Sequence, residues 1–216
     1  MTIDFDLEQA KPAGVYGLLV SLVVPRPLAL VTSTNNDGVV NAAPFSFFNL
    51  LGSDPPVVAL GIGRDETRSL GLKDTARNIL QNGEFVVNLV NEPLAEAMNI
   101  CGTDFPAQVS EIEMAKLSLL PSTKLKVPRI AEAPAQLECR HHSTIEIGRT
   151  RVLLGIVVHL HVAEQFYDAP TNRILTDKIG LIGRMHGRGF YTKTNELFEI
   201  PRLSFSAWQQ SSEDNH

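Results

Sequence analysis

The sequence predicts a mainly β fold, a small closed or partly closed barrel with helices at its periphery. Apolar runs rich in β-branched residues recur along the chain, and Gly, Asn, Asp and Pro separate them as turn signals. Segments that predict strands outnumber those that predict helices, and they are spaced as antiparallel hairpins. Side chains fill the interior of a small barrel, so we expect a large ligand to bind at the rim or between subunits.

The first hairpin is predicted over residues 28–44. Residues 28–32 form an apolar, partly β-branched run that indicates a buried strand. Residues 35–38, Asn-Asn-Asp-Gly, follow as a turn, because these residues tolerate positive φ. The returning strand is expected to stop at Pro44, since proline has no N–H to donate to a ladder.

Two features precede this hairpin. Residues 14–24 are a mixed apolar segment that allows a helical turn before the first strand. Prolines on both sides of Arg26 push it into an extended conformation, which could present the guanidinium at a fixed angle. An arginine in such a position more often lies on the surface.

The segment after Pro44 gathers three aromatic rings around a hydroxyl, in the order Phe45, Ser46, Phe47, Phe48. A flat ligand with a polar edge could use it, with backbone amides and the hydroxyl meeting that edge. The alternative is that the rings belong to the core, and residue type alone favours the core.

A second buried strand is predicted over residues 57–62, and Arg64 lies just beyond its end. The Gly-Ile-Gly at residues 61–63 is not a dinucleotide-binding fingerprint, because the third glycine and the immediate helix are missing.

The most informative polar segment is residues 73–83, which predicts a short helix. Asp74 or Thr75 can cap its start, and Asn82-Gly83 can end it in the left-handed conformation. Lys73 and the Thr75 hydroxyl then lie beside the free N–H groups of the first turn, a combination that suits a phosphate. If this segment is considered alone, an ordinary capped helix with a solvated lysine is the more frequent interpretation.

The remaining elements follow from the same patterns. We expect strands at 84–90, 135–140 and 152–163, the last bending at Gly155, a helix at 93–100 after Asn91, and loops with helical turns at 103–126.

Four histidines on two neighbouring strands raise the question of a metal site. His159 and His161 share one face of their strand, while His141 and His142 lie at the end of the strand before it and would point to opposite faces. No ligand spacing of a known type accompanies them. Polar strand positions facing water account for them, and we predict no metal site.

Residues 177–191 contain four glycines together with Arg184 and His186. Glycines permit close backbone approach or unusual φ. Arg184 and His186 could therefore face an anionic or redox-active ligand, while the alternative is a glycine-rich loop that closes a β architecture.

Composition narrows the class of protein. The chain has 216 residues, 44% of them hydrophobic, and a net charge of −5, so nucleic-acid binding is not expected. Two cysteines do not make a disulfide framework, and neither a signal peptide nor a membrane-spanning run is recognised. We expect one domain over residues 1–216, with its core at about 14–203, in the cytoplasm.

Six segments in this order resemble the flavin reductase-like family of the FMN-binding split-barrel superfamily. They are PRPLALVTS, NDGVVNAAPFSFFN, PPVVALGIG, KDTARNILQNGEFVVNLV, GRMHGRGFYT and FEIPR, and the resemblance covers roughly residues 14–203. It implies a six-stranded antiparallel Greek-key split β-barrel with peripheral helices, a homodimer, and FMN near the dimer interface.

The resemblance also maps FMN contacts onto residues of this chain. The ring and its border are implied at Thr32, Ser33, Thr34, Ser46, Phe47 and Phe48, the phosphate and ribityl end at Arg64, Lys73, Asp74, Thr75 and Asn78, and a closing loop at Arg184, Met185 and His186. Similar proteins often have a small polar residue where this chain has Arg188.

The function implied is that of a flavin reductase that transfers hydride from NADH or NADPH to FMN. His186 is the candidate for contact with the nicotinamide, and a flavin-dependent monooxygenase is a candidate partner. Two alternatives stay open: an FMN-dependent oxidoreductase that retains its flavin and acts on a small molecule, and a non-catalytic flavin-binding module.

Overall fold

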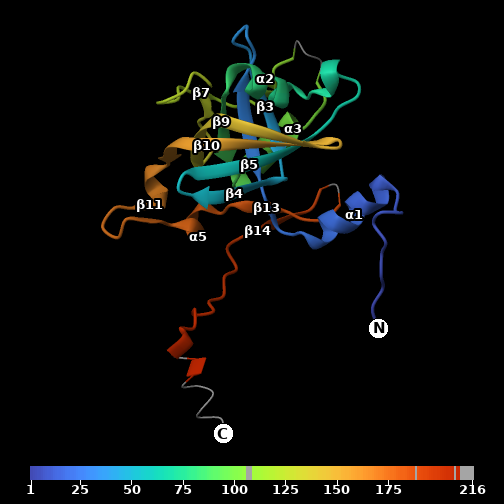
Figure 1. Cartoon of the computed structure of the whole chain (residues 1–216). Helices are drawn as coiled ribbons and strands as arrows, with labels where there is room; N and C mark the ends of the chain where they lie inside the picture. Colours follow the sequence, from blue (N-terminus) through green and yellow to red (C-terminus); the bar gives the residue numbers. More distant parts are fainter. Residues whose placement is uncertain (106–108, 188, 207, 210–216) are drawn as a thin grey trace.

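The computed structural model describes residues 1–105, 109–187, 189–206 and 208–209. Its centre is a seven-stranded antiparallel sheet in the order β3-β2-β6-β9-β10-β5-β4 (Figure 1). These strands are β2 Ala29–Thr34, β3 Val40–Phe45, β4 Phe48–Ser53, β5 Pro56–Gly63, β6 Glu84–Leu89, β9 Ala135–Ile147 and β10 Thr150–Val162.

Smaller elements surround this sheet. The helices are α1 Pro12–Leu22, α2 Asp74–Asn82, α3 Ala95–Cys101, α4 Glu111–Met114 and α5 Thr176–Ile179, with 3-10 turns η1 Ser69–Gly71, η2 Glu92–Leu94 and η3 Glu164–Phe166. The short strands are β1 Arg26–Pro27, β13 Ile182–Arg184 and β14 Tyr191–Lys193 in one sheet, and the pairs β7 Leu119–Leu120 with β8 Arg129–Ile130 and β11 Tyr167–Asp168 with β12 Arg173–Ile174. Among the described helices, none combines the length and the apolar character that a bilayer crossing requires.

The predicted mainly β class is confirmed, but the strand count differs from the six implied. The chain continues past the aromatic segment into β4, which pairs with β5 and adds an edge strand to the sheet. The Gly61 N–H also donates to the Phe47 carbonyl at 2.7 Å, which holds the link from β3 to β4 against β5.

The first hairpin forms as predicted, with one correction. Asn35 Oδ1 accepts hydrogen bonds from the N–H groups of Asp37 and Val39, and Gly38 has φ of 81°. The expectation that the strand stops at Pro44 is wrong, because β3 runs to Phe45 with Pro44 opposite Leu30. Proline is tolerated there because β3 is an edge strand of its sheet.

Two cores lie on opposite faces of β2, which explains its uninterrupted apolar run. Leu28, just before β2, and Leu30 pack into a cluster that includes Leu94, Met98 and Ile112 of the surrounding helical segments. Ala29 and Val31 pack into the other cluster. That second cluster is completed by Phe48, Val58, Leu60, Ile62, Ala76, Ile79, Phe85, Val87, Cys139 and Leu153.

The longest strands, β9 and β10, correct the placing of His141 and His142. We expected them at the end of a strand, but β9 continues to Ile147 as one half of a long hairpin. The register of this hairpin shifts at Leu154/Gly155, near the predicted bend. Glycine is required there, since a Cβ on Gly155 would lie 2.4 Å from the Phe85 ring.

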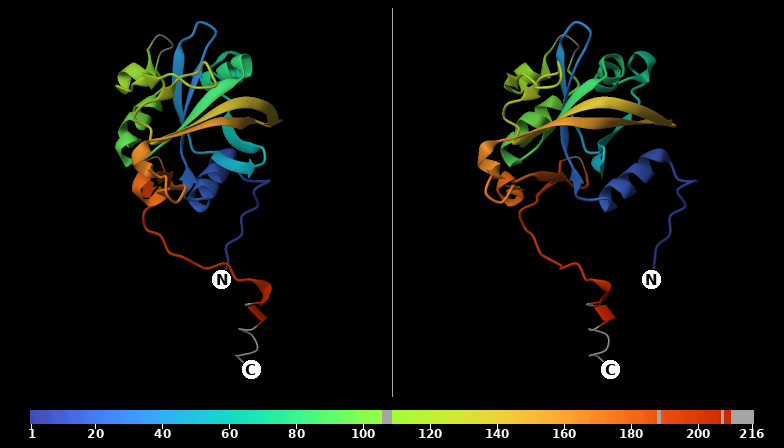
Figure 2. Two further views of the ribbon diagram at one scale, coloured as in Figure 1. Left: turned by 90° about the vertical axis from the view of Figure 1, so that its left-hand side faces the viewer. Right: turned by 60° about the vertical axis from the view of Figure 1, so that its left-hand side comes forward.

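Three further segments position the site. α2 ends as predicted, with Gly83 at φ 70° and its N–H donating to the Ile79 carbonyl. The helix after Asn91 also forms, as η2 followed by α3, with the Asn91 side chain accepting from the Leu94 N–H. Beyond β14 the chain leaves the body of the molecule as an extended segment (Figure 2).

Candidate functional site

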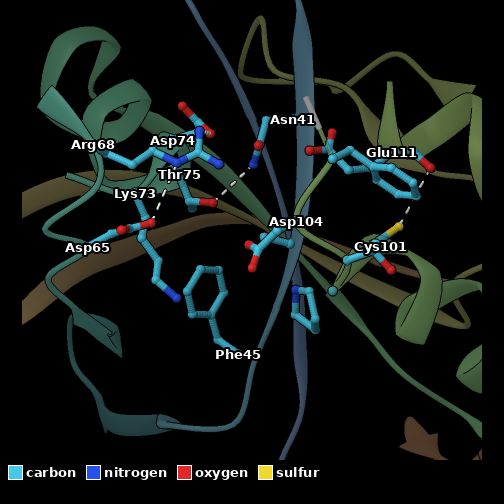
Figure 3. A pocket seen from close by; sticks show the side chains of 15 residues that line it. Asn41, Phe45, Asp65, Arg68, Lys73, Asp74, Thr75, Cys101, Asp104 and Glu111 are labelled. Atoms are coloured by element: carbon cyan, nitrogen blue, oxygen red, sulfur yellow. Dashed lines mark hydrogen bonds and ion pairs between the residues drawn. The ribbon is translucent and has the colours of Figure 1, made fainter. Parts of the chain in front are cut away.

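A polar cavity of about 150 Å³ opens between β3, the start of α2 and the segment that follows α3 (Figure 3). Its lining is Asn41, Ala43, Pro44, Phe45, Asp65, Arg68, Lys73, Asp74, Thr75, Cys101, Gly102, Thr103, Asp104, Phe105 and Glu111. The lining therefore combines the cationic Arg68 and Lys73 with four carboxylates, with hydroxyl and amide groups, and with the Phe45 ring.

The start of α2 differs in detail from the prediction. Lys73 occupies the N-cap position in an extended conformation, and no side chain caps the helix. The first amides of α2 thus have no acceptor within the helix. Both carboxylate oxygens of Asp74 are instead engaged by guanidinium groups, those of Arg68 and Arg77.

The Thr75 hydroxyl is oriented from the neighbouring strand. Thr75 is 2% exposed, and Asn41 Nδ2 donates to its Oγ1 at 3.0 Å. Because the hydroxyl oxygen accepts from Asn41, its own hydrogen is free to donate to a ligand. The exposed Lys73 precedes it by two residues on the same cavity wall.

The acidic groups of this cavity are not equivalent. The Thr67 hydroxyl and N–H donate to Asp65 and lower the pKa of that carboxyl, with a further contribution from Arg68. Burial raises the pKa of Glu111, and the negative charge of Asp74 adds to that effect. The thiol of Cys101, also on the wall, has its pKa raised to about 12 by burial and by Glu111.

A second cavity, of about 320 Å³, adjoins the first. Its lining is Tyr16, Arg26, Leu28, Pro44, Phe45, Ser46, Met98, Asn99, Gly102, Arg184 and Tyr191. Pro44, Phe45 and Gly102 line both cavities. The two cavities therefore adjoin at the end of β3, and we call them together the groove, from the start of α2 to Ser46 and Arg184.

Arg26 lines the second cavity and is held in place by several hydrogen bonds. It is 7% exposed, and its guanidinium donates to the carbonyls of Val20, Val23 and Met185 at 2.8, 2.9 and 3.1 Å. Its Nε lies 3.4 Å from the Ser46 hydroxyl oxygen. The expectation that this arginine lies on the surface is wrong, because it joins α1, the aromatic segment and the closing loop.

Arg184 also lines the second cavity, and it pairs with Arg26 between the strands β13 and β1. Its guanidinium donates to the Tyr191 hydroxyl and lies 4.7 Å from the centre of that ring. It also donates to the Gly187 carbonyl at 3.4 Å, which links β13 to the loop that follows. Arg188 of that loop lies outside the described residues.

Of the residues implied as FMN contacts, Lys73, Asp74 and Thr75 line the first cavity and Ser46 and Arg184 line the second. The others line neither cavity: Thr32, Ser33, Thr34, Phe47, Phe48, Arg64, Asn78, Met185 and His186.

Several of these residues make contacts elsewhere in the protein. The Thr32 hydroxyl donates to the Pro128 carbonyl at 2.7 Å, and Asn78 Nδ2 donates to Ser33 Oγ at 3.2 Å. Thr34 accepts through its carbonyl from Asn82, and Phe48 belongs to the second core cluster.

Three of the remaining residues lie at the outer surface. Phe47 is 48% exposed and packs edge to face on Tyr16 of α1, and Arg64 is exposed beside Gly71. His186 is exposed, and its ring stacks on Phe190 at 5.0 Å. Met185 is half-buried, and its carbonyl accepts from the Arg26 guanidinium.

Sequence reasoning missed several polar groups of the first cavity, among them Asn41, Arg68 and Glu111. Asn41 lies in the returning strand of the first hairpin and pairs there with Ser33, one of the implied FMN contacts. The register of that hairpin could therefore have indicated Asn41 as a site residue. Arg68 and Glu111 belong to segments without a periodic pattern, and no local signal marks them.

Comparison with known protein families and structures gives matches over most of the chain. Residues 21–176 match the family model described as "Flavin reductase like domain". A Deinococcus radiodurans protein described only as uncharacterized is 44% identical over 213 residues, which is 95% of this chain and 92% of the relative.

Two solved structures are similar in sequence as well as in fold. Nitrilotriacetate monooxygenase component B from Bacillus cereus is 34% identical, with a TM-score of 0.86 over 93% of this chain and 99% of the other. The 2-nitrobenzoate 2-nitroreductase NbaA from Pseudomonas fluorescens is 35% identical, with a TM-score of 0.84 over 94% and 98%.

Proposed function

Because the chain belongs to the flavin reductase-like family, we propose that it binds FMN in the groove along β3 and transfers hydride from NADH or NADPH to this flavin. The observation that carries the proposal is that the two cavities adjoin at Pro44, Phe45 and Gly102, one reaching the start of α2 and the other reaching Ser46. A ligand with an anionic tail and a flat ring system matches both ends.

The donor set at the α2 end fits a phosphate. A phosphate monoester carries nearly two negative charges at neutral pH. The Thr75 hydroxyl, the Lys73 ammonium and the first amides of α2 are donors on one wall. Arg68 lines the same cavity, although its guanidinium is already paired with Asp74. We propose Lys73 and Thr75 as the principal phosphate ligands.

At the other end, Phe45 and Ser46 would border the ring system. Arg26 stands behind Ser46 and supplies positive charge close to the ring, where it would favour the anionic reduced flavin. When bound, FMN supplies the hydride-accepting chemistry itself. The protein's part is to orient the two rings and to exclude water.

His186 and Arg184 are proposed to meet the nicotinamide nucleotide. Arg184 lines the second cavity, and the exposed His186 follows it on the loop after β13. The open side of this cavity gives the second nucleotide a place beside the ring. A dedicated general base is not needed, because hydride transfer moves no proton from a protein side chain.

The test is the absorption spectrum of the purified full chain with FMN, recorded before and after anaerobic addition of NADH or NADPH. We expect a flavin band that bleaches with at least one of the two nucleotides. A flavin band that persists with both would refute the reductase proposal while leaving FMN binding intact.

A second function is favoured by the similarity to NbaA, a 2-nitrobenzoate 2-nitroreductase by name. In this alternative the chain keeps its FMN and reduces a small organic molecule in the second cavity. Retention of FMN through gel filtration would favour it. Release of reduced FMN would instead favour a reductase that supplies a monooxygenase, as the name of the Bacillus cereus component suggests.

We also propose that the chain forms a homodimer. The extended segment after β14 exposes Leu197, Phe198, Ile200, Leu203, Phe205 and Trp208, each more than half exposed. An apolar cavity beside α1, lined by Tyr16, Leu19 and Phe47 among others, offers a matching surface on a second copy. Light scattering on the full chain tests this, and a monomeric mass would refute it.

A further inference from the structure

A cluster of metal-ligand side chains lies on the β9–β10 hairpin, away from the groove. Glu138 of β9 pairs directly with His159 of β10, and His161 follows two residues later on the same face. The two imidazole rings are 4.7 Å apart between centroids, at an angle of 63°. None of the three residues lines either cavity of the candidate flavin site.

The carboxylate of this cluster is buried and held in place. Glu138 is fully buried, and its oxygens accept from the N–H groups of Thr123 and Lys124 at 2.6 and 2.7 Å. His161 Nε2 lies 2.6 Å from Glu138 Oε1.

His159 is the residue that a metal site would use and that an ion pair between Glu138 and His161 would not. An ion pair with His161 accounts for Glu138 but gives His159 no part. Within the described residues, the His159 ring has the His161 ring as its contact and no hydrogen-bond partner. One ligand atom from each of the three residues nevertheless lies within 4.8 Å of the other two.

We propose that Glu138, His159 and His161 bind a divalent transition-metal ion of the zinc type. Two imidazole nitrogens and one carboxylate oxygen are a common protein ligand set for zinc, with water in the fourth position. Ligand atoms at about 2.1 Å from a tetrahedral ion are roughly 3.4 Å apart, so small side-chain rotations close the site. The backbone hydrogen bonds on Glu138 supply the outer support that metal-binding carboxylates have.

The prediction of no metal site considered only the histidines. The tertiary structure adds Glu138, which is more than twenty residues away along the chain and becomes a neighbour through strand pairing. A bound ion would tie β9 to β10 and, through Glu138, to the loop at Thr123 and Lys124.

The experiment is a titration of the untagged full chain, first freed of metal with a chelator. Co²⁺ is the spectroscopic probe, because four-coordinate cobalt gives visible d–d absorption, and Zn²⁺ binding is measured by calorimetry. The variants are His159→Gln and His161→Gln, and the control is His142→Gln, an exposed histidine elsewhere on β9. None of them lines the flavin groove, so flavin binding is a separate measurement.

We expect one ion per chain in the wild type and in His142→Gln, with an affinity at least tenfold lower in each of the other two variants. We also expect Zn²⁺ to raise the melting temperature of the wild type and not that of His159→Gln. Absence of stoichiometric binding would overturn the proposal. So would unchanged affinity in His159→Gln, because an ion pair between Glu138 and His161 alone does not involve His159.

Discussion

Asn41 of β3 donates a hydrogen bond of 3.0 Å to the hydroxyl oxygen of Thr75 at the start of α2. This contact joins a strand to a helix more than thirty residues further along the chain. Since the hydroxyl oxygen accepts there, its hydrogen stays available to a ligand in the first cavity, which Thr75 lines. The polar end of the groove is thus oriented before a ligand arrives.

Removal of the proposed phosphate ligands should weaken FMN binding. Lys73→Ala or Thr75→Val deletes one charge-assisted hydrogen bond, and we expect an affinity about tenfold lower or worse, since such a bond contributes roughly 1.5–3 kcal/mol. Quenching of flavin fluorescence on titration measures it. Lys178→Ala is the matched control, an exposed lysine that lines neither cavity. Unchanged affinity in both groove variants would refute this placing of the phosphate.

Loss of the Arg26 side chain should destabilise the fold. Arg26→Ala removes a buried guanidinium and leaves the carbonyls of Val20, Val23 and Met185 without that donor. We expect a free energy of unfolding lower by about 2–4 kcal/mol, judged from hydrogen bonds of charged groups. Urea unfolding followed by circular dichroism measures this. A variant as stable as the wild type would show that water replaces the guanidinium without loss.

A side chain at residue 155 should disrupt the barrel interior. In Gly155→Ala the new methyl group would meet the buried Phe85 ring, and overpacking of this kind costs about 1–3 kcal/mol. Thermal unfolding gives the comparison. Gly63→Ala is the control, because a Cβ at that strand position meets no atom within 4 Å. Equal losses in the two variants would argue against a packing origin.

The raised pKa of Glu111 predicts a pH-dependent effect of Glu111→Gln. The folded state binds the proton more tightly than the unfolded state, whose carboxyl titrates near 4.5. Stability from this group is therefore complete below pH 4.5 and is lost as the pH rises through the folded value. We expect Glu111→Gln to be more stable than the wild type at pH 7.

Melting temperatures of both proteins across this pH range provide the measurement for Glu111. The difference between them should shrink as the pH falls toward 4.5, where the wild-type carboxyl is also neutral. A difference that does not vary with pH would assign the effect to packing.

Local sequence determined much of the secondary structure. The turn at residues 35–38 and the end of α2 at Gly83 depend on residues that tolerate positive φ, and these constraints act within a few neighbours. The apolar run of β2 likewise indicated a strand buried on both faces, which the two core clusters confirm. Six short segments in a fixed order were enough to indicate the family.

Only the tertiary structure decided which side chains meet. Arg26 is buried because α1 and the loop after β13 close around it, and Asn41 reaches Thr75 because β3 lies beside α2. Glu138 faces His159 because of the register between β9 and β10. Such contacts depend on strand pairing and on burial across long sequence separations, so no pattern within a short segment contains them.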